Sequence, residues 1–296
     1  MNTNLPKSES LLAQTQRLLN RFDLRARKGL AQHFLIDREV LNNIVAAADL
    51  TSDDIVMEIG PGLGVLTAEL VRQAGWVIAV ELDNKLAAIL KENLAPASNI
   101  TVVNRDILEI EPGSLFRETK TVLPPEFTRS DSYKVVANLP YYITSAVLRH
   151  FLEATSKPGL MVIMVQKEIA QQIVAQPGDM SLLSNSVQFY GKPRIVCYVT
   201  GSCFYPAPKV DSAVLRIDLY DKPPVAVDDT DSFFRLVKAG FKANRKQIIN
   251  SLSRGLELSK YDILPMLEKA GIDPTRRAET LNLEEWARLY HASGAR

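Results

Sequence analysis

A glycine-rich turn and an acidic residue are the first residues whose spacing indicates chemistry. The run Glu58-Ile59-Gly60-Pro61-Gly62-Leu63-Gly64 follows a short apolar segment and precedes an amphipathic stretch. This order puts the glycines at a strand-to-helix turn, where a ligand can approach the bare backbone. Glu81 lies 21 residues after Gly60, where nucleotide-binding α/β folds place an acid that accepts ribose hydroxyls. The pattern predicts a nucleotide cofactor.

The spacing of the glycines separates two classes of cofactor. A dinucleotide site favours GxGxxG, whereas the turn at Gly60, Gly62 and Gly64 reads GxGxG, a spacing more typical of S-adenosylmethionine sites. No GK[ST] follows the turn, which excludes a phosphate-binding P-loop. The alternative interpretation is a tight turn without a ligand.

Asp106 ends the next apolar run and adds a third polar group. At the tip of a strand, its carboxylate can accept a hydrogen bond from the exocyclic amine of an adenine. The alternative is a helix cap, a common role for an acid at this position. Together with Gly60 and Glu81, three strand tips in chain order would present the backbone, ribose and base contacts of one nucleotide.

The run Asn138-Leu139-Pro140-Tyr141-Tyr142 indicates what the cofactor reacts with. Adenine N6 is a poor nucleophile because its lone pair is delocalised into the ring. A site must therefore accept hydrogen bonds from both N6–H groups to favour a pyramidal nitrogen. The Asn138 side-chain oxygen and the backbone carbonyl at Leu139, kept available by the turn at Pro140, can do this. Tyr141 offers a flat face for an extruded base. The alternative is an asparagine turn beside a buried aromatic residue.

The elements that must position these residues follow an alternating pattern, which predicts helices packed on a mostly parallel sheet. The expected strands are continuous apolar runs, as in strands covered on both faces: 55–60, 76–82, 100–104, 133–139 and 160–166. Helical spacing is found at 65–74, 84–94, 144–154 and 167–175, with Asp83 and Thr144 as expected caps.

The C-terminal part of the chain shows a different pattern. Two β-rich runs, 194–201 and 212–219, are expected to complete the sheet as an antiparallel pair, and the proline-containing segment 221–229 predicts a linker. Beyond it we expect only helices, with Gly255 and Gly271 as stop signals. The expected helices are 231–243, 245–254, 260–269 and 283–291.

Composition bounds the class of protein. The 296 residues are 46% hydrophobic and 23% charged, the balance of a globular chain. No apolar stretch is long enough to span a membrane and the N-terminus lacks a secretory pattern, so we expect a soluble cytoplasmic protein. The only cysteines, Cys197 and Cys203, fit neither a disulfide framework nor a zinc site. We expect two reduced structural thiols and no metal.

Charge is unevenly distributed although the net charge is only +1. Residues 1–38 sum to +4 and residues 232–260 to +6, which leaves about −9 for the remainder. A basic run is usually a solvated helix face, but a substrate adenine in RNA would supply a polyanion. We therefore predict RNA contacts from this second segment, at Lys242, Arg245 and Lys246.

From about residue 25 the chain resembles the ribosomal RNA adenine N6,N6-dimethyltransferases of the kasugamycin-resistance type. The resemblance rests on the glycine turn, on the NLPY run at 138–141 and on five further runs. These are Gln32-His33-Phe34-Leu35, VELD at 80–83, Gln166-Lys167-Glu168, FYPAPKVDSAV at 204–214 and GIDPTRRAE at 271–279.

The resemblance implies roles for individual residues. It implies cofactor contacts from His33, Leu35, Gly60, Gly62, Glu81, Asp106 and Asn138, and it implies that Phe204 covers the face of the target base opposite Tyr141. No strong base is required, because N6 loses its proton readily once methylated, so His33 is expected to bind the methionine end of the cofactor. Ala31 replaces the usual family glycine, and residues 1–24 extend beyond the usual start.

The combined prediction is a class I methyltransferase fold, α/β with a Rossmann-like mostly parallel sheet, and a small C-terminal helical domain. The expected divisions are an extension at 1–24, a methyltransferase domain at 25–220 and an RNA-binding domain at 221–296. By resemblance, the chain dimethylates two adjacent adenosines in a hairpin near the 3′ end of small-subunit rRNA, as a monomer acting on an assembling 30S-type subunit. The alternatives are a large-subunit rRNA methyltransferase and a non-catalytic RNA-binding assembly factor.

Overall fold

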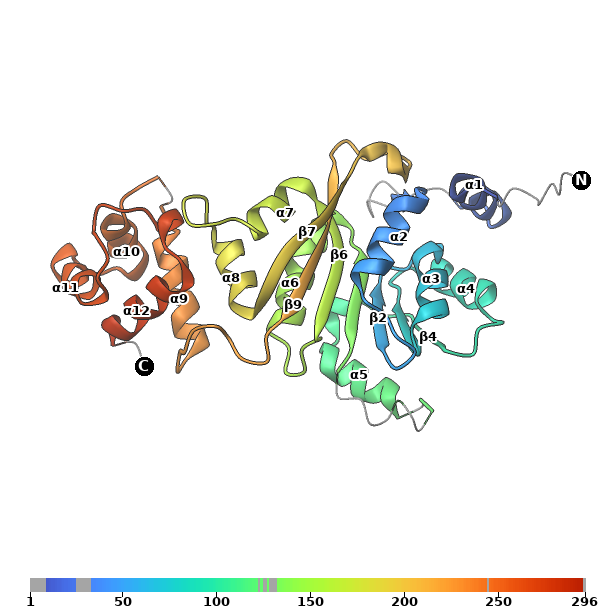
Figure 1. Ribbon diagram of the computed structural model, residues 1–296, viewed down its shortest axis with the longest axis horizontal. Coiled ribbons are helices and arrows are strands. Elements are labelled where there is room, and N and C mark those ends of the chain that lie inside the picture. Colours follow the sequence, from blue (N-terminus) through green and yellow to red (C-terminus); the bar gives the residue numbers. More distant parts are fainter. Residues whose placement is uncertain are drawn as a thin grey trace, which may run out of the picture. The chain divides into compact units, whose positions relative to one another are not determined.

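The computed structural model describes residues 9–24, 33–121, 123, 124, 127, 132–243 and 245–294. The contacts between its residues divide the chain into two compact units (Figure 1). The first unit is Met1–Lys167 with Ile195–Ile217, and the second is Glu168–Arg194 with Asp218–Arg296. The contacts thus group residues 168–194 with the C-terminal helices, whereas the sequence division is contiguous and falls at 220/221.

A seven-stranded sheet in the order β4-β3-β2-β5-β6-β9-β7 organises the first unit. The neighbouring strands pair in parallel in β2·β3, β2·β5, β3·β4 and β5·β6, as predicted. Strands β2, β5 and β6 are almost wholly buried, which explains their continuous apolar sequences. The strands are β2 (Ile55–Ile59), β3 (Trp76–Val80), β4 (Ile100–Val103), β5 (Lys134–Asn138), β6 (Leu160–Gln166), β7 (Gly191–Val199) and β9 (Ser212–Leu219).

Short helices connect the parallel strands. As predicted, Asp83 caps the second of them, accepting from the backbone N–H groups of Lys85 and Leu86. The expected cap at Thr144 is wrong, because Thr144 is the first residue inside its helix and its buried hydroxyl has no partner among the described residues. The connecting helices are α3 (Val65–Gln73), α4 (Asn84–Asn93), which Asp83 caps, α5 (Pro112–Lys120) and α6 (Thr144–Leu152), and α1 (Leu11–Arg21) and α2 (Arg38–Ala47) come before β2.

The parallel order brings separate sequence motifs to one edge of the sheet. The carboxyl ends of β2, β3, β4 and β5 lie side by side, and each is followed by one of the predicted polar groups. In open α/β sheets this edge is where ligands bind. A separate two-stranded sheet, β1 (Phe34–Leu35) against β8 (Phe204–Tyr205), joins residues about 170 positions apart in sequence.

The second unit is helical around its own core. Its largest fully buried side chains are those of Trp286, Tyr290, Phe189 and Phe233. Figure 1 draws its C-terminal helices in orange and red. They are α9 (Thr230–Gly240), α10 (Ile248–Leu256), α11 (Lys260–Ala270) and α12 (Leu283–Ser293), with α7 (Lys167–Ile173) and α8 (Leu182–Tyr190) preceding them in the chain. Segment 221–229 holds no helix or strand, as expected of a linker.

Of the two glycines that were predicted to end helices, one does so and the other does not. Gly271 ends α11 with φ +67°, as predicted. Gly255 is not a stop signal, because it lies inside α10, and a Cβ there would come within 2.4 Å of the Ala239 Cα. Gly255 therefore permits close packing of α10 on α9. The expected helix 245–254 begins three residues late, at Ile248.

Candidate active site

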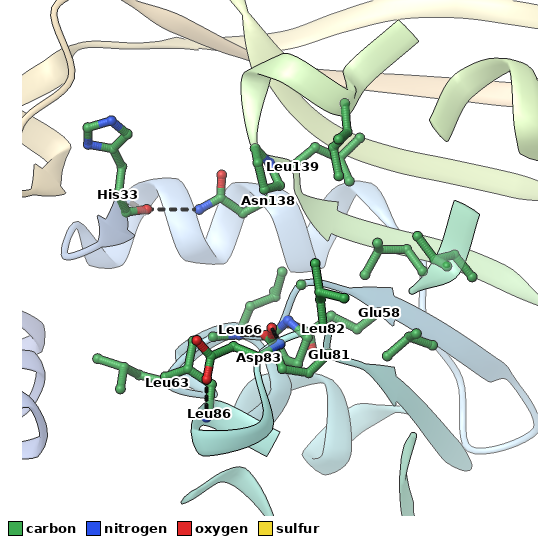
Figure 2. Close-up of a pocket in the computed structure, with 18 of the residues that line it drawn as sticks. His33, Glu58, Leu63, Leu66, Glu81, Leu82, Asp83, Leu86, Asn138 and Leu139 are labelled. Atoms are coloured by element: carbon green, nitrogen blue, oxygen red, sulfur yellow. Dashed lines mark hydrogen bonds between the residues drawn. The ribbon is translucent and has the colours of Figure 1, made fainter. Parts of the chain in front are cut away.

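A cavity of about 320 Å³ opens at the carboxyl edge of the first unit's sheet. Its lining joins the glycine turn to the ends of β3 and β5 and to residues just before β1. In Figure 2, His33 and Asn138 lie in the upper part of the view and Glu81, Asp83 and Leu86 in the lower part. The lining includes the predicted residues His33, Leu35, Gly60, Gly62, Glu81, Asp106, Asn138, Leu139 and Tyr141.

The glycine turn has the backbone geometry that its sequence predicts. Gly60, Gly62 and Gly64 all have positive φ, at 67°, 58° and 84°, a region that side chains rarely adopt. A Cβ at Gly62 would lie 3.4 Å from the Phe34 ring, and one at Gly64 would lie 2.6 Å from Leu90 Cδ1. The turn therefore leaves backbone exposed to the cavity, and the missing side chain at Gly64 lets Leu90 of α4 pack closely against it.

Glu81 is oriented by the turn it faces. One carboxylate oxygen accepts from the Gly62 N–H at 3.0 Å and the other from the Asp83 N–H at 2.9 Å. The side chain is buried, and burial raises the pKa of Glu81 above its usual range. Each oxygen keeps a second acceptor position, so two hydroxyls of a ribose can be bound by this one carboxylate.

Glu58 is a buried acid that the sequence analysis did not single out as a site residue. It lies in β2 and is 1% exposed, and its Oε2 has no partner among the described residues. The pKa of Glu58 is raised to about 8, chiefly by burial, with the nearby Thr67 hydroxyl opposing the change and the Glu81 carboxylate adding to it. The signal was present in the sequence as one charge in an otherwise apolar strand.

Asp106 caps a short helix at the edge of the cavity. It lies where β4 leads into the short 3₁₀ helix η2 (Ile107–Glu109), and its Oδ1 accepts from the Leu108 N–H at 2.9 Å. Asp106 also lines the cavity. Because one carboxylate oxygen completes the cap, the other remains to accept from a base amine.

Asn138 is held so that its oxygen can act as an acceptor. Its Nδ2 donates to the backbone carbonyl of His33 at 3.4 Å, drawn as a dashed line in Figure 2. No described residue donates to its Oδ1. Leu139, the next residue, is 1% exposed and its N–H donates to the Met164 carbonyl, so the chain leaving β5 is fixed at both positions.

Two tyrosines after Pro140 have different environments. The Tyr141 hydroxyl is 2.7 Å from Ser212 Oγ, and its ring lies nearly parallel to the His33 ring, with centroids 6.2 Å apart. Burial raises the pKa of Tyr141 above its usual range. Tyr142 is 61% exposed at the cavity lining, and the sequence analysis gave it no role.

Phe204 is the one predicted base contact that does not line the cavity. Its side chain is 3% exposed and packs in the hydrophobic core of the first unit. Its backbone pairs with Leu35, and the neighbouring Pro206 carbonyl is 2.7 Å from His33 Nδ1. Phe204 therefore supports the loop that carries His33 in this structure.

The predicted RNA contacts lie in the second unit, around the turn between α9 and α10. Lys242, Arg245 and Lys246 are all exposed. Lys242 donates to the Arg254 carbonyl at 3.4 Å, and Asn244 lies outside the described residues. These three cations therefore lie at the surface of the second unit.

The described residues contain no metal-ligand cluster, disulfide or membrane-spanning helix. Among these residues, no group of three or more His, Cys, Asp or Glu is placed to hold a metal ion. Cys197 and Cys203 do not form a disulfide in this structure. Within the same ranges, no helix has the length and apolar character needed to cross a membrane.

The cavity fits a nucleotide-containing sulfonium cofactor. Its glycine turn presents backbone at positive φ to the cavity, and its acids lie at successive strand ends. The unpaired buried oxygen of Glu58 adds an acceptor that a bound ligand can satisfy. These features match the ribose, base and amino groups of S-adenosylmethionine.

Comparisons with known proteins agree with this geometry. A family model described as "Ribosomal RNA adenine dimethylase" matches residues 23–293. Ribosomal RNA small subunit methyltransferase A of Dehalococcoides mccartyi is 51% identical over 280 residues, covering 95% of this chain and 92% of the relative. The protein of the same name from Alkaliphilus metalliredigens is 41% identical, with 96% and 97% covered.

Solved structures give the same result for the fold. A dimethyladenosine transferase from Plasmodium falciparum has a TM-score of 0.73 and 25% identity, covering 89% of this chain and 99% of that one. The 23S rRNA methyltransferase ErmE has a TM-score of 0.67 and 30% identity, covering 88% and 99%. The predicted α/β methyltransferase fold is therefore confirmed.

Proposed function

We propose, from the premise that this chain belongs to the ribosomal RNA adenine dimethylase family, that its cavity binds S-adenosylmethionine and that its acceptors are two adjacent adenosines of small-subunit rRNA. The chain is an S-adenosylmethionine-dependent rRNA adenine dimethyltransferase. The finer proposal places the two adenosines in a hairpin near the 3′ end, with the protein acting as a cytoplasmic monomer on an assembling 30S-type subunit.

The proposed cofactor contacts follow the strand order. Glu81 would accept both ribose hydroxyls, Asp106 the adenine amine, and the Gly60–Gly62 backbone would lie along the methionine portion. His33, Leu35 and Asn138 would close the methionine end. When bound, S-adenosylmethionine supplies an activated methyl group on a positively charged sulfur.

The proposed activation of the acceptor rests on Asn138. Its amide group donates to the His33 carbonyl, which leaves Oδ1 to accept a hydrogen bond from one N6–H, while the Leu139 carbonyl would accept a hydrogen bond from the other. Both acceptors draw N6 toward a pyramidal geometry and localise its lone pair. With S-adenosylmethionine bound, that pair would form the new N–C bond as the methyl–sulfur bond breaks, and the N6 proton would then leave to solvent. Catalysis is thereby achieved mainly by positioning.

Tyr141 is the proposed stacking surface for the extruded base. Its hydroxyl is fixed by Ser212, so the ring has one orientation available to the base. Phe204 remains the residue proposed for the opposite face by resemblance, although its buried side chain would have to turn toward the cavity. The parallel His33 ring already lies on one side of Tyr141.

The single observation that carries the proposal is the meeting of Asn138 with the glycine turn and Glu81 in one cavity. A non-catalytic assembly factor would not require an amide oxygen held beside a cofactor site. The large-subunit alternative has support from ErmE, at 30% identity. The relatives named for the small subunit are more similar, at 51% and 41%, and favour that subunit.

The test uses the purified chain with methyl-labelled S-adenosylmethionine and, in parallel, small-subunit rRNA, large-subunit rRNA and immature small subunits. Labelled nucleotides are then mapped by mass spectrometry. We expect N6,N6-dimethyladenosine at two neighbouring positions of small-subunit rRNA only. Label in large-subunit rRNA would reverse the choice of subunit, and the absence of label in all three would reject catalysis.

A further inference from the structure

A second hollow, lying wholly in the second unit, has a lining unlike that of the cavity. It measures about 890 Å³ and lies between α8 on one side and α9 with the end of α10 on the other. We call it the α8/α9 groove. Its lining residues are Gln172, Ser181, Leu182, Leu183, Arg235, Lys238, Ala239, Phe241, Lys242, Gly255 and Leu256.

The charged residues of the α8/α9 groove are all cations. Arg235 and Lys238 are three residues apart on α9 and therefore share one face, and Lys242 follows four residues later. All three are exposed. None of the described residues that line the groove is acidic, and none of the three cations forms an ion pair within the described part of the chain.

The partners of these cations leave their charge available. Arg235 donates to Ser232 Oγ at 2.5 Å and lies in the field of Asp229, and Lys242 donates to a backbone carbonyl. Lys238 makes no hydrogen bond to a described residue. Asp229 does not line the groove, so the charged side chains along the groove are all positive and attract a polyanion.

The remaining lining is apolar and partly aromatic. Leu182, Leu183 and Leu256 are half-buried, and Phe241 packs with its ring centroid 5.9 Å from that of Trp286. Cations beside an aromatic and apolar floor are the combination that binds single-stranded nucleic acid, with phosphates on the cations and unpaired bases on the floor. A duplex would use only the cations, since its bases are already stacked.

We propose that the α8/α9 groove binds an unpaired segment of rRNA that lies outside the methylated hairpin. The inference rests on the proposed function for its polyanion and extends it by a second RNA-binding surface. It also assigns a role to α8, which the sequence analysis did not predict. Lys242 belongs to the groove, whereas Arg245 and Lys246 do not line it.

The test compares Arg235→Gln with Lys238→Gln, in one double variant, against the wild type. Its matched control is Lys260→Gln with Lys269→Gln, which removes two exposed charges from α11 in the same unit. Filter binding at several salt concentrations uses a mixed-sequence 12-nucleotide RNA single strand, a duplex of the same length, and full-length small-subunit rRNA. Lys238→Gln alone is included, because Lys238 makes no hydrogen bond to a described residue on which the fold of the unit could depend.

We expect the groove variant to bind the single strand several-fold more weakly, with the salt slope lowered by about 0.7 for each phosphate that is no longer neutralised. Methylation of full-length rRNA should fall, whereas methylation of an isolated hairpin should match that of the control. The proposal would be overturned if the binding curves of the groove variant superimposed on those of the control variant. It would also be overturned if the groove variant lost as much affinity for the duplex as for the single strand. If the wild type binds through the groove yet methylates no rRNA, the proposed function fails and the groove stands.

Discussion

The cavity of the first unit and the α8/α9 groove of the second differ in how their polar groups are held. In the cavity, Glu81 and Asn138 are fixed by backbone hydrogen bonds at strand ends. In the groove, Arg235, Lys238 and Lys242 are exposed side chains of one helix and the turn after it. Buried, fixed groups act through position, whereas exposed cations act through summed charge.

This difference makes the two regions distinguishable by experiment. Substitutions in the cavity should cause large losses specific to one step and insensitive to salt. Substitutions of surface cations should cause smaller, roughly additive losses that depend on salt concentration.

The largest effect is expected for Asn138→Ala. Loss of one preorganised polar group in an active site lowers kcat by about 10²–10³-fold, and here the lost Oδ1 is the proposed acceptor for N6. Cofactor binding, measured by calorimetry with S-adenosylhomocysteine, should change far less. Asn138→Asp keeps an acceptor oxygen and should retain part of the activity. Normal dimethylation by the alanine variant would reject the proposed activation of N6.

The cavity was largely predictable from sequence because its residues follow strands in chain order. Gly60, Glu81, Asp106 and Asn138 each end a continuous apolar run, and parallel strands bring such ends to one edge. Glu58 was missed as a site residue because its burial depends on both neighbouring strands. Phe204 was placed by resemblance, and sequence cannot show that its side chain turns into the core.

The next largest effect is expected for Glu81→Ala. Removal of the carboxylate should weaken S-adenosylhomocysteine binding by about 1–3 kcal/mol, because two charged hydrogen bonds to the ribose are lost. Wild-type binding should also weaken as pH falls toward the raised pKa of Glu81, and the variant should lack that dependence. Calorimetry across pH measures both, with NAD as the competing ligand. Tight NAD binding without heat from S-adenosylhomocysteine would refute the cofactor assignment.

A smaller effect, on stability, is expected for Glu58→Gln. The folded-state pKa of Glu58 is raised from 4.5 to about 8, so the folded protein holds an extra proton between these values. Wild-type stability is therefore greatest below the lower pKa and falls as pH rises toward the higher one, by up to about 1.4 kcal/mol per pH unit. Glutamine does not titrate. Thermal unfolding should show that the stability of the variant, relative to that of the wild type, increases as pH rises. A stability difference that does not depend on pH would contradict the burial argument.

The second unit was harder to predict, because its surface depends on helix packing between distant segments. The helices α9, α11 and α12 were expected near their observed positions, but α8 was missed and Gly255 was assigned to a helix end. A glycine that permits close helix packing and one that ends a helix are indistinguishable in sequence. The α8/α9 groove follows only once α8 is placed beside α9.

The smallest effect is expected for Arg245→Ala with Lys246→Ala. Both side chains are exposed in the turn before α10 and outside the α8/α9 groove, so their loss removes charge without disturbing a packed surface. Binding of small-subunit rRNA should weaken, with the salt slope lowered by about 0.7–0.9 for each phosphate that the variant no longer neutralises.

Affinity for S-adenosylhomocysteine should stay at the wild-type value, since neither residue lines the cavity. Combining this pair with Arg235→Gln and Lys238→Gln sharpens the contrast, because cations that bind separate phosphates should contribute to the slope additively. Filter binding of the two double variants and the quadruple variant measures this. If the first pair gives a salt curve superimposable on that of the wild type, Arg245 and Lys246 form an ordinary solvated surface, and RNA binding by the second unit reduces to that of the groove.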